Sequence, residues 1–141
     1  MRISKQGRIT SIFDIGLDRE VVQDAGKTCG FVLFEDKPLA WDAWDVSIFH
    51  TETKSEVNST SMSILEDGPL RASIIAEYHL GNSTIKAEFS LDAFASSMDP
   101  GALAMIRVDS EVDWHERHQF LKFEVNLAID GQNATFDSQF G

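Results

Sequence analysis

The sequence is poor in cysteine, proline and positive charge. Its 141 residues include one cysteine, Cys29, and three prolines, and 12 Lys and Arg against 23 Asp and Glu give a formal charge of −11. A lone cysteine excludes an internal disulfide framework and is compatible with a reducing compartment. The acidic balance argues against binding of a nucleic-acid backbone or an anionic membrane surface. Neutral ligands such as sugars remain compatible with it.

Long apolar runs and common cofactor motifs are also missing. No apolar stretch approaches the roughly 18 residues that span a bilayer, and Met1–Lys5 has no apolar signal-like stretch. The nine glycines are scattered, and none forms G-x-G-x-x-G. Hydrophobic residues make up 43% and charged residues 25%, which is typical of a folded domain. We therefore expect one domain over residues 1–141.

Apolar residues recur with period two, the period of β-strands. One face of the segment 70–80 carries Leu70, Ala72, Ile74, Ala76, Tyr78 and Leu80. After Gly81-Asn82, which suits a tight turn, the face continues with Ile85, Ala87, Phe89 and Leu91. These two runs predict a β-hairpin with one solvated face.

Other segments follow the same alternation. One face of the third run carries Ile106, Val108, Val112 and Trp114, and one face of the fourth carries Leu121, Phe123, Val125 and Leu127. Gln6-Gly7 is typical of a tight turn, and Cys29–Phe34 of a compact strand. No helical stripe is evident. The sequence thus predicts an all-β fold, an antiparallel β-sandwich. Because Asp137–Gly141 has the pattern of another strand, we expect the sandwich to be incomplete at its C-terminal end.

The segment Asp113–His118 is the densest cluster of ionisable side chains. It invites a zinc interpretation, but His115 and His118 are three residues apart in what is predicted to be a strand. Side chains at that spacing point to opposite faces, and no cysteine is near to complete a ligand set. The residues therefore favour a structural role, polar pairing at a strand end or a domain contact, over metal binding.

The segment Trp41–Asp45 offers two interpretations. Indole rings stack on the apolar faces of pyranoses, and the carboxylates of Asp42 and Asp45 accept hydrogen bonds from hydroxyls. Alternatively, Trp41 and Trp44 anchor the core while the aspartates cap turns. The residues alone favour the second interpretation.

Several segments resemble glycoside hydrolase family 38, the α-mannosidases, and most closely its fungal vacuolar and animal cytosolic branch. The two most specific segments are rich in tryptophan. The resembling segments are Lys5–Ile12, Phe34–Val46, Gly68–Ala72, Val112–Glu124 and Asn133–Gly141. Together they cover nearly the whole chain in the family's order.

The resemblance implies a fragment of a multidomain, retaining α-mannosidase that acts on mannose-containing oligosaccharides. The family's catalytic barrel holds the metal, usually zinc, together with the aspartate nucleophile and the acid/base carboxylate. None of those motifs falls in this chain, so no catalytic or metal-binding residue is assigned here. The chain corresponds instead to the family's C-terminal β-sandwich, of the galactose mutarotase-like type.

The resemblance also suggests roles for the two segments. We expect Trp41, Asp42, Trp44 and Asp45 to lie near a sugar site formed largely by the barrel. We expect the segment 113–118 to contact the barrel through Asp113, Trp114, His115, Glu116 and His118. The full-length protein is expected to be a cytoplasmic or vacuolar homo-oligomer.

Two alternatives remain open from the sequence. A stand-alone carbohydrate-binding module could stack sugars on Trp41, Trp44 and Trp114. A structural module could instead serve in oligomerisation, since sandwiches of this type often form subunit contacts.

Overall fold

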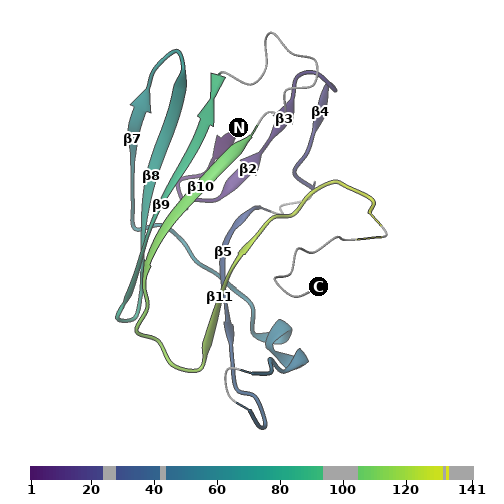
Figure 1. Cartoon of the computed structure of the whole chain (residues 1–141), viewed down its shortest axis with the longest axis vertical. Coiled ribbons are helices and arrows are strands. Elements are labelled where there is room, and N and C mark those ends of the chain that lie inside the picture. The colour runs from purple at the N-terminus through teal and green to yellow at the C-terminus, as the bar shows by residue number, and fades with distance from the viewer. Residues whose placement is uncertain (24–27, 42–43, 94–104, 132, 134–141) are drawn as a thin grey trace, which may run out of the picture.

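The computed structural model describes residues 1–23, 28–41, 44–93, 105–131 and 133 (Figure 1). Its elements are short antiparallel strands and a 3-10 helix. In chain order they are β1 (Arg2–Ile3), β2 (Ile9–Ser11), β3 (Phe13–Asp14), β4 (Arg19–Glu20), β5 (Gly30–Glu35), η1 (Ile48–Thr53), β6 (Ser55–Glu56), β7 (Ser61–Asp67), β8 (Arg71–Leu80), β9 (Ser83–Asp92), β10 (Ile106–Asp113) and β11 (Gln119–Glu124). Among the described residues, no helix is long and apolar enough to cross a membrane.

Two larger sheets form the layers of the domain. The first has the order β10-β9-β8-β7 and the second β11-β5-β6, while β1-β2 and β3-β4 form two-stranded sheets. Every pair of strands is antiparallel. The predicted all-β, antiparallel sandwich is therefore confirmed.

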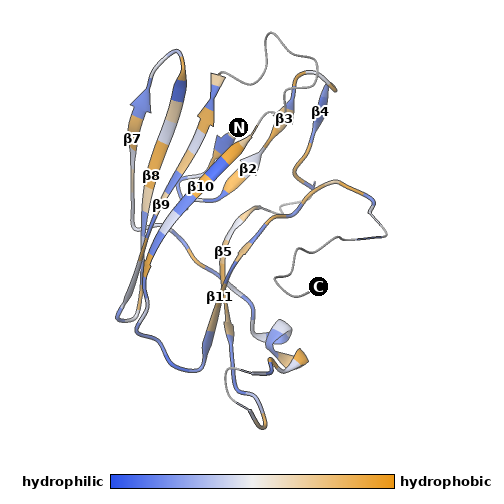
Figure 2. Ribbon diagram, viewed as in Figure 1, coloured by the Kyte–Doolittle hydropathy of each residue, from blue (hydrophilic) through white to orange (hydrophobic). Residues whose placement is uncertain are grey.

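Aromatic rings join the two layers. Phe31 of β5 packs edge-on against Tyr78 of β8, and also against Phe123 of β11, with ring centroids 5.1 Å apart in both pairs. Phe89 of β9 lies 6.3 Å from Phe123. Tyr78, Phe89 and Phe123 belong to the period-two faces predicted from the sequence, whereas Phe31 lies in the compact strand predicted at Cys29–Phe34. Figure 2 shows the alternation along β8 and β9. The core is thus built where the two sheets face each other.

Strand β5 is buried on both of its faces. Phe31 points into the core between the sheets, and alternation turns Val32 and Phe34 to the opposite face. Val32 and Phe34 are nonetheless almost completely buried, and the ring of His50 in η1 packs on Phe34 at 5.1 Å. The helix η1 therefore forms a small third layer outside the β11-β5-β6 sheet.

A buried arginine connects the N-terminal hairpin to β5. Arg8 is 3% exposed, and its guanidinium donates to the carbonyl of Phe31 at 2.8 Å and to Thr28 Oγ1. Glu56 lies 3.4 Å from it and supplies the opposite charge. A Cβ at position 30 would lie 3.1 Å from Arg8 Nη1, so Gly30 provides the space that this arginine occupies.

A second polar contact fixes the turn between β1 and β2. The hydroxyl of fully buried Tyr78 donates to the carbonyl of Gly7 at 2.7 Å. Gly7 has φ +71°, and a Cβ there would lie 2.5 Å from the Tyr78 hydroxyl oxygen. Burial raises the pKa of Tyr78 to about 12, against a smaller lowering by Arg8. The phenol therefore remains a proton donor throughout the physiological pH range.

The sequence predicted the central strands more accurately than the shorter elements. The runs around Gly81-Asn82 form β8 and β9, the third run contains β10, and the fourth run overlaps β11, which begins two residues earlier at Gln119. Trp114 and Val125, however, lie just beyond the ends of β10 and β11, and Val125 is exposed. Strand β7 and the helix η1 were not predicted. The expected strand at 137–141 lies outside the described residues.

Acid should loosen the β3-β4 hairpin through Glu20. Its carboxylate accepts hydrogen bonds from Ser11 Oγ at 2.6 Å and from the amides of Ile12 and Val22 at 2.7 and 3.0 Å. The bond from Ser11 is the largest cause that lowers the pKa of Glu20 from 4.5 to about 2. The stabilisation is therefore present above pH 4.5 and is lost as the pH falls through about 2.

We predict that Glu20→Gln removes this pH dependence. Amide exchange at Val22, corrected for its intrinsic rate, should be faster than in the wild type at neutral pH and should not accelerate further in acid. Glu52→Gln, at an exposed position in η1, is the matched control and should follow the wild type. Identical acid profiles for Glu20→Gln and the wild type would contradict the role of this carboxylate.

Candidate functional site

The loop between β5 and η1 presents two tryptophans to solvent. Trp41 is 77% exposed and Trp44 is 88% exposed. The expectation that these indoles anchor the core is therefore wrong. Asp45 is also exposed, while Asp42 lies outside the described residues.

A hydrogen-bonded turn holds the two tryptophans. The amides of Trp44 and Asp45 donate to the carbonyl of Trp41 at 2.9 and 3.2 Å. Trp41 has φ 63°, a left-handed conformation that is uncommon for a bulky residue. Such backbone strain costs on the order of 1–3 kcal/mol and is concentrated at functional sites. The two hydrogen bonds thus hold the backbone amides of Trp44 and Asp45 against the carbonyl of Trp41.

Further apolar side chains extend the exposed surface around this turn. We use the name loop surface for the exposed residues Leu39, Trp41, Trp44, Val46, Ile48 and Phe49. Single exposed apolar residues are ordinary, but a run of this density marks a contact site for another molecule or domain. The loop surface is therefore the strongest candidate for function among the described residues.

The segment Asp113–His118 begins with the last residue of β10 and continues as the connection to β11. Glu116 ties this connection to the β8-β9 turn. Glu116 Oε1 accepts from the amide of Asn82 at 2.8 Å and from Ser83 Oγ at 3.2 Å. Ser83 Oγ in turn accepts from the amide of His115 at 2.8 Å. A Cβ at Gly81 would lie 2.6 Å from Glu116 Oε1, so the turn glycine is needed for this approach. Glu116 therefore makes a structural contact inside the domain.

The two histidines of this segment do not form a metal site with their neighbours. His115 Nε2 lies 2.9 Å from Asp113 Oδ1, and both side chains are largely exposed. The described residues contain no group of three or more His, Cys, Asp or Glu that could hold a metal ion. The strand context expected for His115 and His118 was wrong, because both lie in a loop and His118 has φ 55°.

The two predicted segments emerge at the same end of the domain. Glu35, the last residue of β5, is paired with Gln119, the first residue of β11. The amide of Asp36 also donates to the carbonyl of His118 at 2.8 Å. In Figure 1 this end lies at the bottom, below β5 and β11. The sequence could not reveal this proximity, since the two segments are about 70 residues apart.

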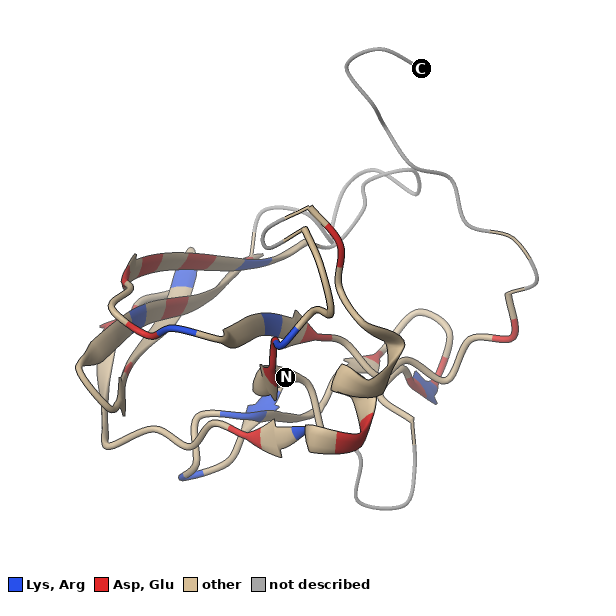
Figure 3. Ribbon diagram, turned by 90° about the horizontal axis from the view of Figure 1, so that it is seen from below, with Lys and Arg blue, Asp and Glu red and all other residues tan. Residues whose placement is uncertain are grey.

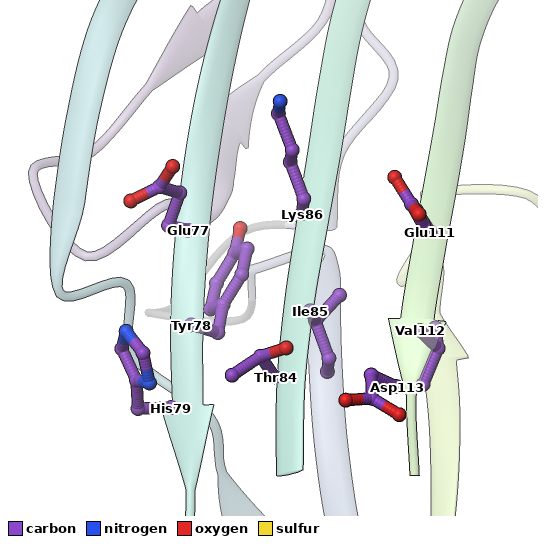
Figure 4. A pocket seen from close by; sticks show the side chains of 9 residues that line it. All are labelled: Glu77, Tyr78, His79, Thr84, Ile85, Lys86, Glu111, Val112 and Asp113. Carbon is purple, nitrogen blue, oxygen red and sulfur yellow. The ribbon is translucent and has the colours of Figure 1, made fainter.

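The four-stranded sheet carries a shallow groove that the sequence did not predict. Its volume is about 620 Å³, and Glu77, Lys86, Glu111 and Asp113 line it together with residues of β8, β9 and β10 (Figure 4). The strand register places Lys86 between Glu77 and Glu111. Figure 3 shows both acidic and basic residues along the strands. The lining is that of a solvated, charged sheet face, and it shows no arrangement of catalytic groups.

Known proteins match the entire chain. A family model described as "Glycosyl hydrolases family 38 C-terminal domain" matches residues 1–141. The chain belongs to this family. The resemblance seen in the sequence is thereby confirmed, and the C-terminal position of the domain agrees with it.

Curated members of the family are much longer than this chain. Human alpha-mannosidase 2C1 is 33% identical over 144 residues, which cover 100% of this chain and 13% of that protein. Alpha-mannosidase G of Dictyostelium discoideum is 29% identical over 145 residues, covering 99% of this chain and 13% of the relative. An alpha-mannosidase of Saccharomyces cerevisiae is 28% identical over 149 residues, which cover 97% of this chain and 13% of that protein. The family 38 chain thus spans about an eighth of these relatives.

We predict that Glu116→Ala weakens the connection between β10 and β11. The mutation leaves the Asn82 amide without its charged acceptor, which should cost about 1–2 kcal/mol and accelerate exchange of that amide roughly tenfold. Glu111→Ala, at an exposed position on β10, is the control and should leave the exchange of Asn82 unchanged. Equal exchange in Glu116→Ala and the wild type would show that this carboxylate is dispensable for the loop.

Proposed function

We propose that this family 38 domain is a non-catalytic part of a retaining α-mannosidase that hydrolyses terminal α-mannose residues from oligosaccharides. In this proposal the domain supports a catalytic barrel elsewhere in the same protein, and its loop surface helps to frame the sugar site. The names of the curated relatives support the enzymatic context. The exposed Trp41 and Trp44 support the role of the loop.

The chemistry of the loop suits a sugar. The flat indoles offer faces for the C–H side of a pyranose, and most of their area is already exposed. Asp45, and Asp42 outside the described residues, would supply acceptors for sugar hydroxyls. Leu39, Ile48 and Phe49 offer apolar area for packing on a neighbouring domain. One loop could therefore contact both the barrel and the substrate.

The second segment is proposed as an interdomain contact. Glu116 is occupied within the domain, as the bonds to Asn82 and Ser83 show. Asp113 and His115 are exposed and paired with each other, and His118 is exposed as well. Trp114 is half-buried. The contact would thus be made by Asp113, His115 and His118 rather than by the whole segment.

The hydrolytic machinery is proposed to lie outside this chain. A retaining glycosidase needs two carboxyl groups about 5–5.5 Å apart, and the family's metal, expected to be zinc, needs several ligands. The described residues offer no suitable ligand group. Zinc binding, homo-oligomerisation and a cytoplasmic or vacuolar location of the full-length protein remain predictions.

A stand-alone carbohydrate-binding module is the competing proposal, and the exposed indoles also suit it. Titration of the isolated chain with mannobiose, monitored by tryptophan fluorescence, distinguishes the two proposals. A change that saturates at modest concentrations and disappears in Trp44→Ala would favour the binding module. No change up to high concentration would favour a loop that works only beside another domain.

We predict that Trp41→Ala and Trp44→Ala, each in the full-length protein, lower kcat/KM for an α-mannoside. Loss of one stacking or packing contact should cost about tenfold. Phe13→Ala removes an exposed aromatic ring from β3 and should leave kcat/KM unchanged. Wild-type kinetics in both tryptophan variants would exclude a role of the loop in the sugar site.

We also predict that the isolated 141-residue chain does not hydrolyse an aryl α-mannoside, with or without added zinc. The reason is that the proposed nucleophile, acid/base and metal ligands all belong to the barrel. Release of the aryl group, measured by absorbance, checks this. Metal-dependent turnover by the purified chain would overturn the proposed division of roles.

A further inference from the structure

His50 sits at the base of the loop surface, between aromatic rings. It belongs to η1, which also carries the exposed Ile48 and Phe49. Its imidazole packs on Phe34 of β5 and Phe120 of β11, with ring centroids 5.1 and 5.8 Å away. The position of η1 on the sheet therefore depends directly on this side chain.

The hydrogen bonds of His50 require a neutral imidazole. Nδ1 lies 2.7 Å from the carbonyl oxygen of Ser47, and Nε2 lies 3.1 Å from Lys122 Nζ. A carbonyl oxygen only accepts and an ammonium group only donates. Nδ1 must therefore carry the proton, and Nε2 must offer its lone pair to Lys122. The Ser47 carbonyl and the Lys122 ammonium group together select the neutral tautomer that carries its proton on Nδ1.

The ammonium group of Lys122 is held by the same aromatic rings. It lies 5.0 Å from the centroid of Phe34 and 4.7 Å from that of Phe120. Cation–π attraction at such distances holds the ammonium group over the two rings. Lys122 thus bridges the sheet to η1 as a cation.

We propose that His50 and Lys122 form a pH-sensitive clamp that holds η1, and with it the loop surface, on the β11-β5-β6 sheet at neutral pH and releases it in acid. The inference deepens the proposed function, because it assigns a regulation to the loop that is proposed to frame the sugar site. The clamp itself stands on the contacts of His50 and can be tested without any substrate.

Protonation of the His50 imidazole breaks the clamp because it removes an acceptor and adds a positive charge beside Lys122. A proton on Nε2 removes the lone pair that accepts from Lys122 and places two cations about 3 Å apart. Histidine is the side chain whose charge changes between pH 5 and 8. Either Lys122 then leaves the aromatic rings or His50 leaves the sheet. Both changes remove cover from Phe34 and loosen the helix that supports the loop surface.

No described carboxylate forms an ion pair with His50 to offset this repulsion. On β11, Glu124 is paired with Lys54. On β6, Glu56 contacts Arg8, and on β5, Glu35 points to the opposite face from Phe34 and is paired with Lys37. Within η1 itself, Glu52 is exposed. The ammonium group of Lys122 is therefore the charge that the imidazole meets.

Hydrogen exchange of the full-length protein tests the clamp. Exchange at amides 48–54, corrected for intrinsic chemistry, should rise about tenfold between about pH 7.5 and about pH 5.5, since one linked proton changes an opening equilibrium by up to tenfold per pH unit. In His50→Gln, whose side chain cannot be protonated but keeps an acceptor for Lys122, this rise should disappear. The same rise in His50→Gln as in the wild type would overturn the proposal.

Lys122→Met provides a second test that does not alter the histidine. It keeps an unbranched apolar chain over Phe34 and Phe120 but removes the charge, so the acid-induced rise should shrink severalfold. An undiminished rise in Lys122→Met would also overturn the clamp, even if His50→Gln had loosened η1 at every pH. His79→Gln, at an exposed position on β8, is the control and should follow the wild type.

The failure of the proposed function can be told apart from the failure of the clamp. Wild-type kinetics in Trp41→Ala and Trp44→Ala would refute the proposed sugar role, but the exchange experiment would still test the clamp.

Discussion

The structure depends on one strand that is buried on both of its faces. On the inner face of β5, Phe31 packs on Tyr78 and Phe123 and so joins the two sheets. On the outer face, Val32 and Phe34 are covered with the help of η1. A strand that is buried on both faces needs other elements to cover each of them. The burial of β5 therefore fixes the positions of both the core and the segment that carries the loop surface.

Buried polar groups restrict how the chain enters and leaves this strand. Arg8 donates to the Phe31 carbonyl and needs the space left by Gly30, so the start of β5 is tied to the N-terminal hairpin. At the other end, the amide of Asp36 is bonded to the carbonyl of His118. Unpaired buried donors are costly, and these bonds satisfy them. As a result, both loops at this end of the domain begin from fixed backbone.

The sequence predicted the parts of the fold that follow a local rule. Alternation, broken only at Ile75, identified β8 and β9, because their neighbours in space are also neighbours in the chain. Strand β7 was missed, since a bulge between Ile64 and Glu66 breaks its alternation and most of it is exposed. The role of His50 was invisible because Lys122 lies 72 residues away. The exposure of Trp41 and Trp44 likewise depends on tertiary structure, and the resemblance to family 38, not the periodicity, suggested their role.

The two loops at the end of β5 differ in what their side chains are free to do. In the β10-β11 loop, Glu116 is satisfied within the domain, and the exposed Asp113 and His115 already pair with each other. In the β5-η1 loop, Trp41, at φ 63°, and Trp44 are 77% and 88% exposed, so most of their apolar area remains in water. Burial of such area is the larger source of free energy on association. Under the proposed function, the β5-η1 loop provides most of the affinity for the catalytic barrel, while the β10-β11 loop contributes orientation through its charges.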